Sequence, residues 1–365
     1  MTTMRDVAAV AGVSAKTVSR VFNADPHVLP ATRAHVEAVL QQLGYVPNTL
    51  ATTFRSGRAA AMGVVVPDIM DPFFSAIAKA VETVAAQHDM AVMISTLGDD
   101  PSQEPKILES LLSRQISGLV MAPLTRDQSY LRAWADRVAV VLVDRAPVAL
   151  NVYYFVEDDH GGARTATEHL LRHGHRRIAF LGDTLELSTT QNRLEGYRAA
   201  LRAAGRPVDE DLVVLGAGTA AGAEVAVAGL QGLLDPPTAV FSSNARCSMY
   251  LVPAMAGQRW AVVAFGDFPL ANMLSPALTV IDQDPMSLGT MAAERVVARV
   301  HHPERRHRRR NVLPVHLVER ESCGRRGLTP LFPQSRRDLP QRHLKLAETT
   351  DLLPSHTDNT QTGVG

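Results

Sequence analysis

From residue 61 onward the chain alternates between short apolar runs and longer amphipathic stretches. The apolar runs have the length and the β-branched content of buried strands, whereas the amphipathic stretches repeat their apolar residues at helical spacing. The predicted strands are residues 62–67, 90–96, 118–122, 139–144, 177–182, 212–216, 238–243, 260–266 and 277–282. The predicted helices are residues 73–87, 104–114, 163–173, 193–204, 220–233 and 285–300. This alternation predicts an α/β fold of parallel sheets, and so many strands indicate two doubly wound lobes with a cleft between their strand ends.

The first 46 residues have a different pattern, with three short helices. The first is predicted from about Met4 to Ala11, with Thr3 as its N-cap, and Gly12 ends it. The second runs from about Ser14 to Phe22, and the third from about residue 31 to 43, before Gly44. Three helices with a tight turn between the first two predict a helix-turn-helix unit.

The C-terminal part breaks the alternation. Residues 301–310, HHPERRHRRR, are a basic run that we interpret as a solvated loop between the last helix and a final strand. Residues 324–365 are rich in Pro, Arg, Ser and Thr and have little periodicity, which predicts a disordered tail. The predicted domains are therefore residues 1–46, a linker over 47–58, a two-lobed core over 59–323, and the tail.

Composition and charge add a local signal. Lys plus Arg and Asp plus Glu are equal at 37 each, but residues 1–58 hold six basic and three acidic side chains, which points to nucleic acid. Cys247 and Cys323 are the only cysteines and have no partner at metal-ligand spacing, which favours a reducing compartment. The chain shows neither a signal-peptide pattern nor an apolar run that could span a bilayer. We therefore expect a cytoplasmic protein.

The stretch MRDVAAVAGVSAKTVSRVFN (4–23) carries the strongest functional signal. A helix that starts at a sharp turn projects its first side chains ahead of the body, where a major groove can receive them. Ala15, Lys16 and Arg20 would face base edges. Short polar side chains suited to phosphate oxygens accompany them: Ser14, Thr17, Ser19, Asn23 and His27. The competing interpretation is a three-helix protein-interaction module without DNA.

This stretch resembles the N-terminus of the lactose-repressor (LacI) family of bacterial transcription regulators. The resemblance continues in order through GYVPN (44–48), GVVVPDIMDPFF (63–74), VVLVDR (140–145), GHRRIAFLG (174–182), NRLEGY (192–197), TAVFSSN (238–244) and LTVIDQDP (278–285). It implies a homodimer whose two heads read double-stranded palindromic operator DNA. It also implies a hinge helix and a core similar to periplasmic sugar-binding proteins, with a small-molecule effector such as a carbohydrate in the cleft.

The resemblance also gives a role to residues 48–56. In the family this segment forms a helix only on operator DNA, and two copies pair in the minor groove, where an apolar side chain, usually Leu, wedges between central base pairs. Phe54 stands at that position, and the other implied minor-groove residues are Asn48, Ala51 and Thr52. An aromatic wedge can unstack a base step and kink the duplex. The family commonly has Arg where Thr52 stands and often has a Ser helix cap where Pro30 stands. The alternative for Phe54 is packing against the core.

An effector site is implied by the same motif matches. Polar ligands need carboxylates, amides and guanidinium groups beside an aromatic face. The candidates are Asp68, Phe73, Phe74, Asp144, Arg193, Asn244, Asp267 and Gln283. The family's effector-binding Asp falls at Gly266, so either Asp267 replaces it, or the ligand differs from the usual sugars, or there is no effector. Each polar candidate could instead cap a strand or join the lobes.

Two further patterns have simpler interpretations. LVVLGAGTAAG (212–222) has glycines at a spacing that does not fit a dinucleotide fingerprint, so we expect an ordinary crossover turn and no cofactor. His169 and His173 are one helical turn apart, which suits a metal, but the Glu of H-E-x-x-H is missing, so we expect no metal site. No nucleophile–base or cofactor constellation supports an enzyme. A DNA-binding regulator, most simply a repressor, is thus the first hypothesis, and a small-molecule binding protein without DNA binding is the alternative.

Overall fold

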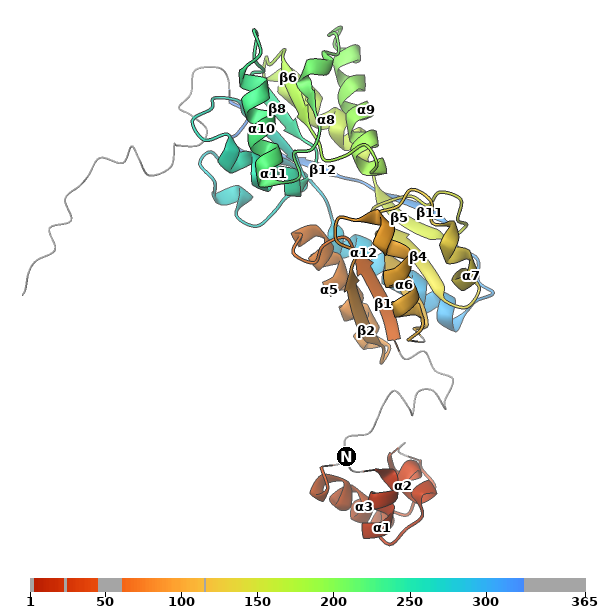
Figure 1. Ribbon diagram of the computed structural model, residues 1–365. Coiled ribbons are helices and arrows are strands. Elements are labelled where there is room, and N and C mark those ends of the chain that lie inside the picture. Colours follow the sequence, from red (N-terminus) through yellow and green to blue (C-terminus); the bar gives the residue numbers. More distant parts are fainter. Residues whose placement is uncertain (1–2, 23–24, 45–60, 115, 325–365) are drawn as a thin grey trace, which may run out of the picture.

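A computed structural model describes residues 3–22, 25–44, 61–114 and 116–324 of the chain (Figure 1). The N-terminal head consists of α1 (Met4–Val10), α2 (Ala15–Phe22) and α3 (Pro30–Gln42). Valines and alanines from all three helices form its small core, with Val7, Val18 and Val36 fully buried. The three predicted helices are confirmed within one or two residues at each end.

Local side-chain chemistry fixes the helix starts in the head. Thr3 and Asp6 form a reciprocal capping box on α1, and the hydroxyl of Ser14 accepts a hydrogen bond from the Thr17 amide at 3.1 Å. Gly12 has a φ of +62°, which permits the tight turn between α1 and α2. Pro30 occupies the first turn of α3, where no amide donor is needed, and Leu29 before it provides no side-chain cap.

The first lobe of the core is a six-stranded sheet in the order β11-β5-β4-β3-β1-β2. Its strands are parallel: β1 (Ala61–Val66), β2 (Ala91–Thr96), β3 (Gly118–Met121), β4 (Ala139–Val143), β5 (Tyr153–Glu157) and β11 (Arg310–Leu313). Two helices, α5 (Pro72–Gln87) and α12 (Pro285–His301), bury one face of this sheet. On the other face lie α6 (Glu104–Leu112) and α7 (Arg132–Ala135).

The second lobe repeats this architecture with the order β12-β10-β9-β8-β6-β7. Its strands are β6 (Ile178–Leu181), β7 (Val213–Val214), β8 (Ala239–Ser242), β9 (Ala261–Phe265), β10 (Thr279–Asp282) and the antiparallel β12 (His316–Val318). On one face pack α8 (Asp159–Arg172) and α9 (Ser188–Ala203), and on the other α10 (Ala220–Gln231) and α11 (Ala245–Ala254). The predicted doubly wound α/β fold is confirmed.

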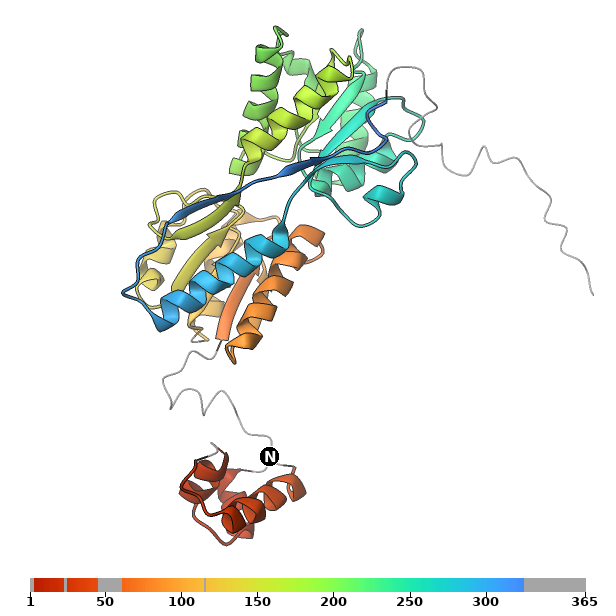
Figure 2. The same cartoon turned by 180° about the vertical axis from the view of Figure 1, so that it is seen from behind.

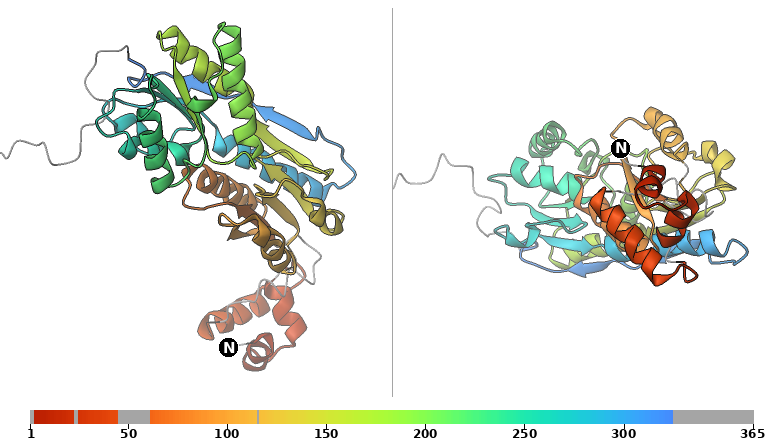
Figure 3. Two further views of the ribbon diagram at one scale, coloured as in Figure 1. Left: turned by 45° about the horizontal axis from the view of Figure 1, so that its top comes forward. Right: turned by 90° about the horizontal axis from the view of Figure 1, so that it is seen from below.

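Three connections join the lobes, between β5 and α8, between β10 and α12, and between β11 and β12. Figure 2 shows β11 and β12 as one extended segment that runs from the first lobe to the second. The two lobes thus lie end to end beside these connections, as the tilted view of Figure 3 also shows. The carboxyl ends of the parallel strands of both sheets face the region between the lobes, which is where ligands bind in such sheets.

The sequence pattern missed β5, α7 and α11, and it predicted one final strand where the structure has β11 and β12. It also placed the starts of α8 and α9 several residues too late. The basic run at 301–310 is exposed, as expected, except that His307 is half-buried, and it begins in α12 and ends in β11. No helix among the described residues is long and apolar enough to cross a bilayer. The predicted hinge over 47–58 and all but the first residue of the predicted tail over 324–365 lie outside the described residues.

Candidate functional site

The head presents α2 with its polar face outward. Ala15, Lys16 and Arg20 are exposed, while Val18 and Val21 of the same helix are buried in the head core. Because residues 15, 16 and 20 occupy the side of α2 opposite the buried valines, they can approach a partner together. The structure therefore brings the three predicted base-reading residues to one surface.

Arg20 is held by an acidic neighbour. Its Nε donates a hydrogen bond to Asp25 Oδ2 at 2.8 Å, and Asp25 Oδ1 accepts the amide of His27 at 2.9 Å. Arg33 on α3 donates to the Asp25 carbonyl at 2.7 Å. An ion pair through Nε leaves the terminal fork of a guanidinium for a bidentate contact with a guanine edge.

The predicted phosphate contacts divide into three groups. Ser14 and His27 are exposed, and Thr17 and Ser19 are half-buried. The hydroxyls of Ser14 and Thr17 lie 2.9 Å apart, so the start of α2 carries a connected pair of donors. Asn23 and the hinge residues Asn48, Ala51, Thr52 and Phe54 lie outside the described residues.

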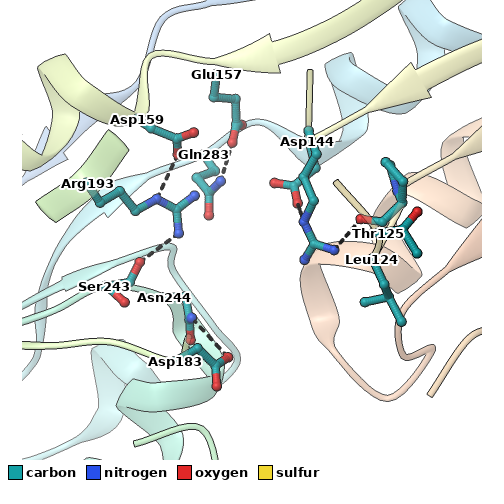
Figure 4. A network of polar contacts seen from close by, with 12 residues as sticks. Leu124, Thr125, Asp144, Glu157, Asp159, Asp183, Arg193, Ser243, Asn244 and Gln283 are labelled. Atoms are coloured by element: carbon teal, nitrogen blue, oxygen red, sulfur yellow. Dashed lines mark hydrogen bonds and ion pairs between the residues drawn. The ribbon is translucent and has the colours of Figure 1, made fainter. Parts of the chain in front are cut away.

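A cleft of about 520 Å³ separates the two lobes. Seven of the predicted effector residues line it: Asp68, Phe73, Phe74, Asp144, Arg193, Asn244 and Gln283. They come from the carboxyl ends of β1, β4, β8 and β10, from the first turn of α5 and from the second turn of α9. Figure 4 shows Asp144 on one side and Arg193 with Asn244 on the other. The topology therefore gathers residues that are far apart in the sequence.

Asp267 does not line this cleft. Its carboxylate is bound to the guanidinium of Arg320, with Oδ1 3.1 Å from one terminal nitrogen, and Oδ1 also accepts the Phe268 amide. The expectation that Asp267 replaces the acid missing at Gly266 is therefore not supported by the geometry. Gly266 itself has a φ of +83°, and a Cβ there would come within 2.8 Å of Gln283 Oε1. The amide of Gln283 thus takes the space that an acidic side chain at 266 would need.

Arg193 is the most constrained residue of the cleft. It is 5% exposed, donates from Nε to Asp159 Oδ1 at 2.7 Å and from one terminal nitrogen to the Ser243 carbonyl at 2.6 Å (Figure 4). Its guanidinium carbon lies 3.7 Å from the centre of the Phe265 ring. These contacts fix the planar group from three sides and leave its second terminal nitrogen for a ligand hydroxyl.

A buried pair of acids lies behind the cleft and was not predicted. Glu157 and Asp159 flank the first connection between the lobes, and both are buried. Glu157 accepts hydrogen bonds from the Gln283 amide and from the Asp284 backbone. Burial raises the pKa of Glu157 to about 8, and the hydrogen bond from the Gln283 side chain is the main effect that opposes this rise. Burial also raises the pKa of Asp159 to about 6, and the charge of Arg193 is the main effect that opposes it. The sequence EDD after YYFV was a usable signal, because acids after a buried strand lie at the ligand-binding edge.

This burial predicts a pH dependence of stability. Between pH 4.5, the ordinary value for Glu, and about 8, folded Glu157 holds a proton that the unfolded chain has lost, so the free energy of unfolding should fall as pH rises. Urea unfolding at pH 5, 6, 7 and 8 measures this fall in the free energy of unfolding. The Glu157→Gln variant should lose part of this decline and be more stable than the parent at pH 8. Identical slopes in the two proteins would contradict the assignment.

The charges in the cleft are unevenly matched. Six carboxylates and three guanidinium groups line it. Each guanidinium already has an acidic partner: Arg145 lies 3.2 Å from Asp144, Arg193 pairs with Asp159, and Arg246 pairs with Asp99. The remaining acidic lining residues, Asp68, Asp71, Asp183 and Glu186, have no ion pair within the described part of the chain. The lining therefore carries an excess of negative charge.

Two structural details complete the cleft. The pair between Arg246 on α11 and Asp99 after β2, at 2.9 and 3.2 Å, joins the two lobes directly. The glycine-rich turn at 216–219, expected to be an ordinary crossover, contributes Gly216, Gly218 and Thr219 to the lining. A Cβ at Gly218 would lie 2.0 Å from Asp183 Oδ1, so a larger residue there would displace the Asp183 carboxylate.

A buried carboxylate also positions the loop that forms one wall. Glu104 at the start of α6 is fully buried and accepts hydrogen bonds from the amides of Leu124 and Thr125 and from the hydroxyls of Thr125 and Tyr130. Leu124 lines the cleft. Four donors on one buried carboxylate hold this loop in place without a cation.

Both the head and the core of this chain match known protein families. Residues 3–48 match the model of bacterial regulatory proteins of the lacI family. Residues 59–321 match the periplasmic binding proteins and sugar-binding domain of the LacI family. The ribose operon repressor of Escherichia coli K12 is 30% identical over 332 residues, which cover 88% of this chain and all of the relative. The regulator GalS of Salmonella typhimurium LT2 is 33% identical over 301 residues, 80% of this chain and 88% of the relative.

Solved structures of transcription regulators also align with most of this chain. The lac repressor dimer bound to operator and the anti-inducer ONPF aligns with a TM-score of 0.77 at 25% identity, covering 88% of this chain and 99% of that one. The regulator CelR in complex with cellobiose aligns with a TM-score of 0.64 at 30% identity, covering 88% and 100%. Because its helix-turn-helix head and its two-lobed core both match the family models, and relatives at least 30% identical are matched over most of their length, the chain belongs to the lacI family of bacterial DNA-binding transcription regulators, which are not enzymes.

Proposed function

We propose that this protein is a repressor that binds a palindromic operator as a homodimer and changes its affinity for DNA when a small molecule enters the cleft. The observation that carries this proposal is the cleft between two lobes that are joined by three connections and by the Arg246–Asp99 pair. A ligand that contacts both lobes favours one lobe arrangement over another, and it regulates DNA binding only as far as its affinities for the two arrangements differ. Working on DNA, the protein would act in the cytoplasm.

The head would read the operator through Ala15, Lys16 and Arg20, with Ser14, Thr17, Ser19, Asn23 and His27 on phosphates. The exposure of α2 and the Asp25-supported guanidinium of Arg20 support these roles. In domain terms, we propose that residues 1–46 bind DNA, residues 47–58 form the hinge and residues 59–323 bind the effector and dimerise.

The hinge supplies a separate prediction. If Phe54 is an apolar wedge, Phe54→Ala should weaken binding to the operator by at least about tenfold. Unstacking a base step costs a few kcal/mol, and the shortened side chain can no longer offset that cost. Binding to random DNA at low salt should change little, because phosphate contacts dominate it. Fluorescence anisotropy with both duplexes measures the two affinities. An equal loss on both duplexes would show that Phe54 does not act as a wedge.

For the effector, we propose an uncharged or cationic polyhydroxylated molecule, and not a phosphorylated sugar. All three guanidinium groups of the lining are already paired with carboxylates, and unpaired acids remain. A phosphate would therefore meet net repulsion and find no available cation. Asp68, Asp144, Asn244, Gln283 and Arg193 are the proposed hydroxyl contacts, with Phe73 and Phe74 as the apolar face; Asp267 is left out because Arg320 binds it.

Two measurements test this proposal. Selection of random duplex DNA by the full-length protein should enrich a palindrome, and loss of the selected binding on adding a ligand would establish induction. Isothermal titration with ribose, cellobiose and ribose 5-phosphate compares the ligand classes, ribose and cellobiose being suggested by the names of relatives. Binding of the phosphate ester but not of a neutral sugar would contradict the proposed ligand class.

A further inference from the structure

Three side chains outside the cleft converge at the end of α8. His169 lies on this helix, His173 is its C-cap residue, and Glu319 follows β12. One ligand atom of each residue lies within 4.8 Å of the others. His173 Nε2 is 3.6 Å from Glu319 Oε1, and the two imidazole rings have their centres 4.5 Å apart. Among the described residues this is the one group of three such ligands.

The fold explains how the carboxylate reaches the two histidines. Residues four apart on a helix lie above one another, so His169 and His173 share a face of α8. This helix packs against the sheet edge where β12 pairs antiparallel with β10. Because β12 crosses from the other lobe to this edge, it brings Glu319 beside the last turn of α8. The H-E-x-x-H criterion considers neighbours in sequence and could not detect this third ligand.

His169 provides an independent indication of a ligand. It is 2% exposed, and its Nε2 makes no hydrogen bond within the described part of the chain. A buried polar nitrogen without a partner costs about 1–3 kcal/mol, so a group that satisfies it would be stabilising.

We propose that His169, His173 and Glu319 form a binding site for a divalent transition metal ion such as Zn²⁺. Two imidazole nitrogens and one carboxylate oxygen are a ligand set that Zn²⁺ accepts, with water in the fourth position. Ligand atoms around zinc lie about 3.3–3.5 Å apart for bonds of about 2.0–2.1 Å, so the three groups must approach one another slightly. His173 and Glu319 can do so, because their side chains are 32% and 60% exposed. Arg172, exposed on the same turn, opposes the ion's charge and limits affinity.

The ion would connect α8 to the end of β12. Both segments enter the second lobe directly after the chain has left the first lobe, at two of the three connections between the lobes. A metal ion that binds only the folded lobe stabilises it by mass action. The site is therefore expected to act as a metal-dependent clip of the second lobe.

The test uses full-length protein stripped with a chelator and then titrated with ZnCl₂, by isothermal calorimetry and by thermal unfolding. The variants are His173→Asn and Glu319→Gln. A matched control is His302→Asn with Glu304→Gln, since His302 and Glu304 also form an exposed pair, at 3.8 Å, without a third ligand. Every histidine other than His173 and His302 is present in all of these proteins, so weak binding at other histidines is common to them. Far-ultraviolet circular dichroism verifies that the variants are folded.

We expect one Zn²⁺ to bind the parent and the control with equal affinity and to raise their Tm. Each ligand variant should bind at least tenfold more weakly and show a smaller rise in Tm. Equal binding and equal Tm shifts in the parent, His173→Asn and Glu319→Gln would overturn the proposal, as would the absence of any zinc-dependent heat or Tm shift in the parent.

Discussion

Replacing Arg193 by Ala should destabilise the core by about 3–5 kcal/mol, as is usual when one member of a buried ion pair is removed. The change leaves the Asp159 carboxylate and the Ser243 carbonyl without their donor and uncovers the Phe265 ring. Because the same guanidinium faces the cleft, the variant should also lose its response to the effector. Urea unfolding measures the first effect, and operator binding with and without ligand measures the second.

The same helix offers a matched control. Arg198 pairs with Glu195 and Glu210 at 3.0 and 2.8 Å, but both acids are more than half exposed. Arg198→Ala should therefore cost no more than about 1 kcal/mol and leave the effector response intact. Arg193→Lys keeps the charge but cannot satisfy both partners and should fall between the parent and Arg193→Ala. Equal costs at 193 and 198 would show that the buried network contributes little.

The second large effect is expected in the head. In a double variant, Lys16→Ala with Arg20→Ala, operator affinity should fall at least about 30-fold, since a good base contact is worth about 1–3 kcal/mol. Affinity for random DNA should fall much less, so the ratio of specific to non-specific binding should collapse. Binding to the selected operator and to a scrambled duplex, each measured at several salt concentrations, separates the contribution of base contacts from that of phosphate contacts.

A control for this variant lies in the core. Lys79 on α5 is exposed and pairs with Glu82 at 2.6 Å, so Lys79→Ala removes a cation without altering the head. It should bind both duplexes as the parent does. If the double variant loses affinity for the operator and the scrambled duplex by the same factor, then Lys16 and Arg20 contact phosphates and do not read bases.

The elements that the sequence predicted well share a physical cause. Strands such as β1 and β9 are buried along their whole length, so they read as continuous apolar runs. In the head, the helix caps and the turn glycine interact only with residues a few positions away, as Thr3 with Asp6, Ser14 and Gly12 show. Local chemistry was therefore enough to place α1 and α2. The missed strand β5 carries partly exposed residues, as do β11 and β12, of which the sequence predicted only one final strand. Both β11 and β12 also depend on pairing with distant strands.

The difference between local signals and long-range contacts also explains which site residues were predicted. Motif order in the sequence identified seven residues of the cleft, because each lies at the end of a predicted strand or at the start of a predicted helix. It placed Asp267 there as well, although Arg320, far along the chain, binds that carboxylate. The roles of Glu157 and Asp159 were not predicted, since they depend on burial beside Arg193 and Gln283.

The sequence by itself determined the family, the head, the two-lobed α/β architecture and the strand ends that face the cleft, since these follow from apolar periodicity, caps and ordered motifs. Only the tertiary structure decided which charges are paired and which acids are buried. It alone also placed Glu319 beside two histidines at the end of α8. Ion pairing, desolvation and metal ligation depend on distances of a few ångströms between residues far apart in the chain, and no local pattern specifies those distances.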